Sequence, residues 1–119
     1  EERLMVTRFR TGEERCLDVY PLSAWRKLEE KILAKPRFDP ELQRFKRVYV
    51  SGAHECALDG QGRILVPQHL RDYAGIKRDV VCAGGVDIFQ IWDRGSWDKV
   101  FGNDEQIFDQ PDVMGRLGL

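Results

Sequence analysis

The sequence has little cysteine and lacks long apolar runs. Cys16, Cys56 and Cys82 lie far apart and form no CxxC pair, so neither a disulfide framework nor a zinc cage is expected. The longest apolar runs, such as residues 80–83, are much shorter than the roughly 18 residues that a membrane-spanning helix needs. No basic stretch is followed by an apolar one, as a secretory signal requires. These absences favour a cytoplasmic protein without a membrane span.

An excess of charge of one sign is also absent. The chain of 119 residues carries 19 Lys and Arg against 20 Asp and Glu, a net charge of −1. The overall field therefore does not attract polyanions, and any contact with nucleic acid has to be local. A hydrophobic share of 42% and a charged share of 33% suit a soluble domain, or two closely coupled small units.

Strand and helix signals alternate along the chain, which predicts an α+β fold. In the first half we expect a hairpin of residues 4–7 and 16–20, connected through the polar residues 10–15. It is followed by a helix over 22–34 capped by Ser23, and by a second helix capped by Asp39 with Leu42, Phe45, Val48 and Tyr49 on its buried side. In the second half we expect strands at 53–58 and 64–66, followed by a helix over 68–74 that is ended by Gly75. A hairpin of 79–83 and 86–92, joined through Gly84-Gly85, and a short helix capped by Asp93 follow. Residues 103–119 show no clear pattern and predict a flexible tail.

Part of the chain repeats itself. Residues 19–25 align with 91–97 at a displacement of 72 residues, and each copy has strand, aromatic, helix and Trp in the same order. Trp25 and Trp97 occupy matching positions and are expected to be packing anchors. The counterpart of residues 56–75 would precede residue 1. We therefore expect an incomplete first repeat, either in a truncated chain or in one that pairs with another chain to cover its apolar face.

Residues 59–67, Asp-Gly-Gln-Gly-Arg-Ile-Leu-Val-Pro, resemble the second repeat of the MraZ family, as do Leu70-Arg71 and Tyr73-Ala74-Gly75. The lead-in Asp39-Pro40-Glu41, the pairs 44–45 and 55–56, and the triplets 51–53 and 91–93 extend the resemblance, which covers residues 4 to 101. It divides the chain into residues 1–38 (the end of the first MraZ-type repeat), 39–102 (the second repeat with its leading helix) and 103–119 (the tail).

The resemblance implies an AbrB-like swapped-hairpin β-barrel with short flanking helices and two pseudo-repeats. It further implies a ring-like homo-oligomer associated with the nucleoid. The partner would be double-stranded promoter DNA, bound at repeated sequences upstream of cell-division and cell-wall genes. In this family each repeat carries a D-x-x-x-R turn, and the N-terminal one is thought to face DNA. Here a single such turn is present, formed by Asp59 and Arg63.

The turn has the chemistry for DNA contact. The guanidinium of Arg63 can donate two parallel hydrogen bonds to guanine or phosphate, and Asp59 can orient it by accepting a third. Gly60, Gln61 and Gly62 would bring backbone N–H groups close to a phosphate, and Arg71 would extend the basic strip. The competing interpretation is structural: Asp59 caps the turn and pairs with Arg63 on the surface.

Other functions have weaker signals. His54 and Cys56 share a strand face, but no orienting third group accompanies them, so a hydrolase is disfavoured. Arg44, Lys46 and Arg47 form a cluster that is typical of a solvated helix face. We expect no catalytic residue, metal, cofactor or small-molecule substrate. The alternative to a DNA-binding regulator is an oligomeric assembly module that binds no nucleic acid.

Overall fold

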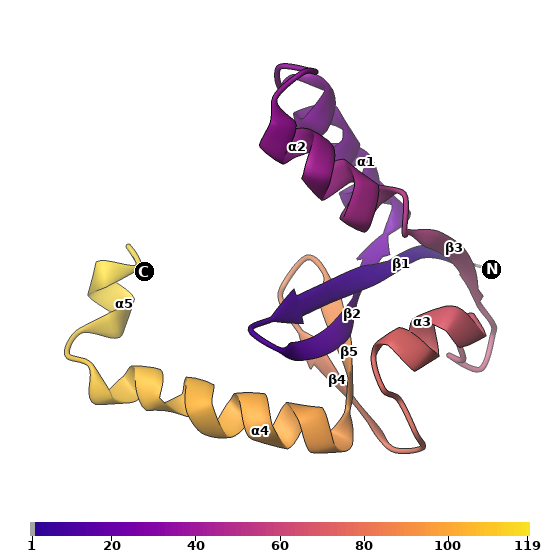
Figure 1. Ribbon diagram of the computed structural model, residues 1–119. Coiled ribbons are helices and arrows are strands. Elements are labelled where there is room, and N and C mark those ends of the chain that lie inside the picture. Colours follow the sequence, from indigo (N-terminus) through magenta and orange to yellow (C-terminus); the bar gives the residue numbers. More distant parts are fainter. Residues whose placement is uncertain (1) are drawn as a thin grey trace.

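The computed structural model describes residues 2–119 and contains a five-stranded antiparallel sheet with helices around it (Figure 1). The order of strands across the sheet is β3-β1-β2-β5-β4. Their bounds are β1 Glu2–Thr11, β2 Glu14–Pro21, β3 His54–Leu58, β4 Val80–Gly84 and β5 Phe89–Asp93. The helical elements are α1 Leu22–Leu33, α2 Pro40–Phe45, the π-helical turn η1 Lys46–Val50, α3 Gln68–Tyr73, α4 Arg94–Asp104, the 3-10 turn η2 Glu105–Asp109 and α5 Val113–Arg116.

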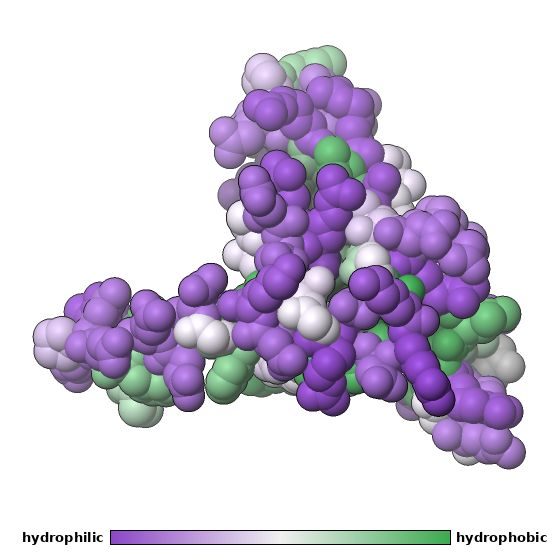
Figure 2. Space-filling view, turned by 60° about the horizontal axis from the view of Figure 1, so that its bottom comes forward, coloured by the Kyte–Doolittle hydropathy of each residue, from purple (hydrophilic) through white to green (hydrophobic). Residues whose placement is uncertain are grey.

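The predicted α+β class is confirmed, but the sheet stays open and does not close into a barrel. Two helical arms extend from the sheet, one formed by α1 and α2 and the other by the helices from α4 to α5 (Figure 1). The face of the molecule shown in Figure 2 is mostly hydrophilic, with small separate hydrophobic patches. None of the helices within residues 2–119 is long and apolar enough to cross a membrane.

The first hairpin is longer than the sequence pattern indicates. Residues 10–15 were expected to connect the strands, yet Arg10 pairs with Arg15 and Thr11 with Glu14 in the ladder. The turn is confined to Gly12 and Glu13, and Gly12 has a φ of +58°. Glycine adopts this left-handed conformation without the steric cost that other residues meet, which permits so tight a connection. The hairpin tip is therefore regular strand structure.

The two halves of the sheet meet where β2 pairs with β5. Asp18 lies opposite Gln90, with Leu17 opposite Ile91 and Val19 opposite Phe89. Asp18 and Gln90 are 72 residues apart, which is the displacement of the sequence repeat. An antiparallel pair centred on equivalent residues relates its two strands by an approximate two-fold rotation. The structure thus places the repeated segments around a pseudo-two-fold axis.

The aromatic residues follow the same rotation. Tyr20 contacts Trp25 with ring centroids 5.1 Å apart, and the equivalent residues Trp92 and Trp97 are 6.1 Å apart. Both pairs meet edge to face and join the end of a strand to the helix that follows it. Trp25 also stacks on Tyr49, and it is only 5% exposed. The prediction that the two Trp residues serve packing is confirmed by these contacts.

One face of the sheet carries the hydrophobic core, which α3 covers. The core residues come from both predicted repeats, and they are Leu4, Val6, Leu17, Val19, Cys56, Leu70, Ala74 and Ile91. Leu70 of α3 is fully buried, and Gly75, two residues after the end of the helix, has a φ of +64° that fits the predicted left-handed cap. The predicted units 1–38 and 39–102 therefore share one core. The first position of unit 1–38 lies outside the described residues.

The opposite face of the sheet holds a buried polar network. The carboxylate of Asp18 accepts hydrogen bonds from the Tyr49 hydroxyl and, at 2.9 Å, from Gln90 Nε2. Trp92 Nε1 donates to Gln90 Oε1 at 3.0 Å, and the hydroxyls of Tyr20 and Tyr49 are 2.5 Å apart. Burial raises the pKa of Asp18, and the hydrogen bonds from Tyr49 and Gln90 partly oppose this. The network joins β2 and β5, whose pairing we call the seam, to η1.

Helix capping matches the predictions at two of three N-termini. Asp39 Oδ1 accepts from the backbone N–H of Glu41 at 2.9 Å, and Asp93 Oδ2 accepts from that of Gly95 at 3.2 Å. The predicted cap at Ser23 is wrong, because α1 starts at Leu22 with Pro21 in the cap position and no side-chain cap. The fixed φ of Pro21 lets β2 continue directly into the helix.

Two predicted strands also differ. Residues 64–66 form no strand: Ile64 makes one isolated bridge to Leu58, and the chain then runs on toward α3. The side chains still alternate, since Ile64 and Val66 pack on the core while Leu65 is exposed. The second hairpin is not joined through Gly84-Gly85. Gly84 ends β4, residues 85–88 form the connection, and Val86 in it has a φ of +80°.

Helical phase explains further differences in burial. Phe45 and Val48 were expected on the buried side of the second helix, but both are exposed, and Tyr49 alone of that side is buried. The π-helical turn η1 changes the angular spacing of residues 46–50 and so turns Val48 outward. Residues 103–119 form η2 and α5 rather than an irregular segment, although no residue of these two elements is buried. Flexibility of this tail stays a prediction.

Trp25 and Trp97 offer a direct test of the packing. We expect Trp25→Ala to lower the free energy of unfolding by about 3–5 kcal/mol, the usual cost of truncating a buried Trp. Trp97→Ala should cost less, because Trp97 is only partly buried. Urea unfolding of both variants checks this. Equal losses, or a loss near zero for Trp25→Ala, would contradict the packing described above.

The buried carboxylate predicts a dependence of stability on pH. Its pKa in the folded chain lies above the ordinary value of 3.8. The stability contribution of Asp18 is therefore fully present below that value and is lost as pH rises through the raised folded pKa. We expect wild type to lose stability relative to Asp18→Asn as pH increases across this window, in urea unfolding at several pH values. A difference that stays constant with pH would contradict the raised pKa.

Candidate nucleic-acid interface

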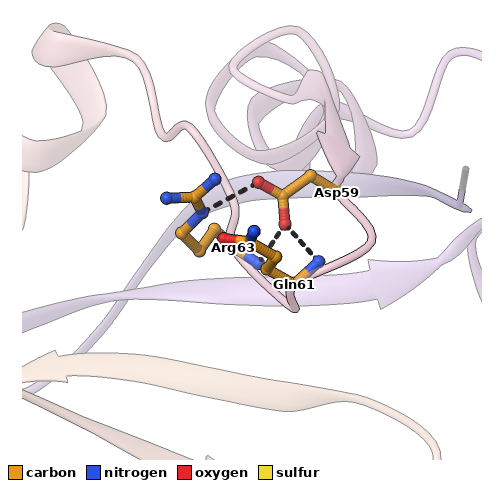
Figure 3. Close-up of polar contacts among 3 residues, drawn as sticks. All are labelled: Asp59, Gln61 and Arg63. Carbon is orange, nitrogen blue, oxygen red and sulfur yellow. Dashed lines mark hydrogen bonds and ion pairs between the residues drawn. The ribbon is translucent and has the colours of Figure 1, made fainter.

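The loop after β3 is a compact turn built around Asp59 (Figure 3). Asp59 Oδ1 accepts hydrogen bonds from the backbone N–H groups of Gln61 and Arg63, both at 2.9 Å. The backbone of Asp59 is bonded twice more, from its N–H to Arg63 O and from Gly62 N–H to its own carbonyl, both at 3.0 Å. Gly62 has a φ of +77°, a conformation that glycine adopts without the steric cost that other residues meet. The local sequence thus fixes the turn without help from the rest of the chain.

The side chain of Arg63 is attached to the same carboxylate. Its Nε lies 2.9 Å from Asp59 Oδ2, and the Arg63 side chain is 73% exposed. Within residues 2–119 the guanidinium makes no other hydrogen bond or ion pair, and the bond to Asp59 uses Nε rather than either terminal nitrogen (Figure 3). The edge formed by the two terminal nitrogens can donate two parallel hydrogen bonds to a partner outside the chain.

The electrostatics of the turn keep Asp59 ionised. The backbone N–H of Arg63 is the main cause that lowers the pKa of the Asp59 carboxyl below its ordinary value, and the Arg63 side chain and the Gln61 N–H add to it. The charged carboxylate in turn holds Nε of Arg63. The DNA-contact interpretation and the structural interpretation both include this bond.

The backbone of the turn is less available than the sequence suggested. The N–H groups of Gln61, Gly62 and Arg63 all donate inside the turn, and that of Gly60 has no acceptor among the described residues. A phosphate could therefore meet the N–H of Gly60, while Gln61 and Gly62 serve the turn itself. Gln61 also keeps an exposed side chain at the tip.

Arg71 lies on α3, and together with Gly62 it lines a groove of about 320 Å³. The other lining side chains are mostly apolar and include Ile64, Ile76 and Ile91. The Nε atom of Arg71 is buried and has no hydrogen-bond partner in the described part of the chain. The structure therefore brings Arg71 next to the turn, but it packs the stem of this side chain into the molecule rather than onto the exposed strip with Arg63.

A group of arginines that the sequence analysis did not single out surrounds Tyr73 at the far end of α3. The guanidinium carbon of Arg15 is 5.1 Å from the centre of the Tyr73 ring, and that of Arg8 is 5.9 Å from it. Arg10 lies directly opposite Arg15 in the β1–β2 ladder. The available signal was the strand-like alternation of Arg8, Phe9 and Arg10, but the sequence analysis ended the strand at residue 7 and interpreted residues 10–15 as the connection. We call Arg8, Arg10 and Arg15 the hairpin arginine cluster.

The other predicted polar groups do not assemble into a reactive site. Cys56 Sγ lies 3.7 Å from the backbone oxygen of His54, not from its imidazole. Burial is the main cause that raises the pKa of the Cys56 thiol, which disfavours the thiolate that a nucleophile requires. No group of three or more potential metal ligands occurs within residues 2–119. Arg44 and Arg47 are exposed, as expected for a solvated helix face.

The chain is thus an α+β protein with an open antiparallel sheet and an exposed arginine on a glycine-containing turn. Such an arginine can donate hydrogen bonds to a partner outside the chain. Comparison with known proteins narrows this class. The family model of the MraZ protein, described as antitoxin-like, matches residues 49–115. This chain belongs to the MraZ family.

Several relatives named transcriptional regulator MraZ are similar to this chain. The relative from Thioalkalivibrio sulfidiphilus is 39% identical over 123 residues, covering 100% of this chain and 80% of the relative. The one from Heliobacterium modesticaldum is 47% identical over 88 residues, covering 74% and 62%. The one from Desulfitobacterium hafniense is 46% identical over 96 residues, covering 81% and 65%. In the last two cases the matched stretch is less than two thirds of the relative.

The charge on Asp59 can be measured directly. We expect an NMR titration of its carboxyl carbon to give a midpoint below 3.8, the ordinary value. Because the pKa is depressed, the stability that this carboxylate contributes is present above the ordinary pKa and is lost as pH falls through the folded pKa. In Arg63→Ala the midpoint should rise only in part, since the backbone N–H of residue 63 remains. A midpoint at or above 3.8 in wild type would contradict the turn geometry.

Proposed function

We propose that this protein is a DNA-binding transcriptional regulator that recognises repeated promoter sequences upstream of bacterial cell-division and cell-wall genes. Its membership of the MraZ family and the names of its relatives support regulation of transcription. The single observation that carries DNA contact is the free edge of the Arg63 guanidinium, held at Nε by Asp59. The proposed place of action is the nucleoid in the cytoplasm.

The proposed contact uses a preorganised guanidinium. Arg63 donates its two terminal nitrogens to O6 and N7 of a guanine, or to two oxygens of a phosphate. Asp59 keeps the planar group in one orientation, so little conformational freedom is lost on binding. Gly60 offers its backbone N–H to a neighbouring phosphate, Gln61 lies at the tip, and Gly62 permits the turn. Net charge plays little part, which agrees with the balanced composition.

Assembly completes the proposal. One turn makes few contacts, and affinity for DNA accumulates with the number of cations, so several turns along repeated sites bind far better than one. The outer edge of β4 supports self-association, because β4 pairs only with β5 within residues 2–119. The apolar groove that Ile64, Val66 and Cys82 line lies beside it. The proposed assembly is a ring-like homo-oligomer. Each chain contributes the end of a first repeat, residues 1–38, and a second repeat, residues 39–102.

The test compares a labelled duplex from the proposed promoter region with a scrambled duplex at fixed salt. We expect wild type to prefer the promoter repeats and Arg63→Ala to lose about 1–3 kcal/mol of this discrimination per contact. Arg63→Lys should keep nonspecific binding but lose most of the preference, since it cannot donate a planar pair. Arg37→Ala, which removes an exposed loop arginine, is the matched control. Light scattering should show one oligomer size for all four proteins.

Two outcomes would overturn parts of this proposal. Equal affinity of wild type for both duplexes would rule out sequence recognition, and unchanged discrimination in Arg63→Ala would remove the turn from the interface. Assembly without binding to either duplex would favour the oligomeric module, the alternative that the open sheet edge also suits.

A further inference from the structure

The hairpin arginine cluster concentrates positive charge that the chain leaves unbalanced. Arg10 and Arg15 face each other across the strands, an arrangement that destabilises a ladder when the charges are alike. Neither they nor Arg8 make an ion pair within residues 2–119. The nearest acids in sequence point elsewhere: Glu14 pairs with Lys99 at 4.0 Å, and Glu13 stands exposed in the turn. The repulsion between Arg10 and Arg15 would be relieved by an anion bound from outside the chain.

The cluster is also oriented rather than loose. The guanidinium groups of Arg8 and Arg15 both lie against the ring of Tyr73, whose hydroxyl donates to Phe9 O at 3.5 Å. Arg8 Nη2 donates to Val48 O at 3.3 Å, and Arg8 Nε is buried without a hydrogen-bond partner among the described residues. Cation–π contact fixes the planes of two guanidinium groups. Arg8 is thereby held against the fold, and the exposed Arg10 and Arg15 lie beside it with their charge open to solvent.

The charge extends into a neighbouring groove of about 510 Å³. Arg8, Arg10 and Arg44 line it together with Tyr73, against a single acidic lining residue, Glu41. Phe45 of the same groove is exposed. Planar guanidinium groups match the oxygen geometry of phosphate, and several in a row on an open surface suit a repeating polyanion better than an isolated anion. The α3 helix lies between this cluster and the turn that carries Arg63 (Figure 1).

We propose that Arg8, Arg10 and Arg15 form a second DNA contact, which binds backbone phosphates without regard to sequence. This inference rests on the proposed function: the Arg63 turn discriminates between sequences, and the hairpin arginine cluster supplies salt-dependent affinity. The two contacts therefore differ in a measurable way. Loss of Arg63 changes the preference between duplexes, whereas loss of the cluster weakens binding to all duplexes equally and lowers its dependence on salt.

The experiment measures binding of the full chain to promoter and scrambled duplexes by fluorescence anisotropy from 50 to 200 mM salt. The variants are Arg10→Gln, whose side chain makes no hydrogen bond or ion pair in the described region, and Arg10→Gln/Arg15→Gln. The control Arg26→Gln/Arg37→Gln removes the same charge from exposed sites elsewhere. Thermal melts and circular dichroism confirm that each variant folds.

We expect the slope of log affinity against log salt to fall in magnitude by about 0.9 for the single variant and by about 1.8 for the double variant. Over this salt range wild type should lose about 12-fold more affinity than the double variant. Discrimination between the duplexes should stay as in wild type, and the control should keep the wild-type slope.

A slope that is unchanged in Arg10→Gln/Arg15→Gln, while wild type still prefers the promoter, would overturn this inference alone. Wild type that binds neither duplex would overturn it together with the proposed function. A change in oligomer size with an unchanged slope would also overturn it, because the cluster would then hold an acidic segment of a second copy. The segment from Asp104 to Asp112 offers such charge.

Discussion

The β2–β5 pairing is the contact on which the sheet depends, because β1 and β3 reach the rest of the structure through β2, and β4 reaches it through β5. At its centre Asp18 and Gln90 are joined by a hydrogen bond, and Tyr49 binds the same carboxylate from η1. A buried carboxylate is costly unless its oxygens are satisfied. The bonds from Gln90 and Tyr49 therefore fix the register of the seam and the position of the helical arm together.

Both candidate contacts lie at the ends of α3, and they are built by different means. The turn at Asp59 is stabilised by hydrogen bonds among residues 59–63, so its geometry depends little on distant parts of the fold. The hairpin arginine cluster depends on tertiary structure, since it requires the β1–β2 register and Tyr73 of α3. A destabilised variant is expected to keep the first contact longer than the second.

This contrast explains how much the sequence could predict. Local signals were reliable where neighbouring residues determine the outcome: the caps at Asp39 and Asp93, the left-handed Gly75 and the bond between Asp59 and Arg63 were all predicted. The repeat was visible too, and its displacement of 72 residues corresponds to the pairing at the seam. These features depend on a few residues each, whose chemistry is independent of the remaining fold.

Features that arise from distant contacts were missed. The hairpin tip was interpreted as a loop because Arg10 and Arg15 are polar, although ladder pairing makes them strand. Val48 was expected to be buried because the pattern assumes 3.6 residues per turn, which the π-helical η1 does not obey. Residues 64–66 alternate as a strand does, but they form none because only Ile64 pairs with another strand. The buried role of Asp18 had no local signal, since its two hydrogen-bond donors, Tyr49 and Gln90, come from the distant segments η1 and β5.

The pseudo-two-fold seam affects which strand β2 can pair with, β5 of the same chain or β2 of another molecule. Its halves are related by rotation, yet the residues on the axis differ, with an acid on one strand and an amide on the other. Were β2 to pair with β2 of another molecule in this register, two carboxylates would meet in the interior without a donor between them. Divergence at this single position thus protects the intramolecular pairing and discourages exchange of the first hairpin between molecules.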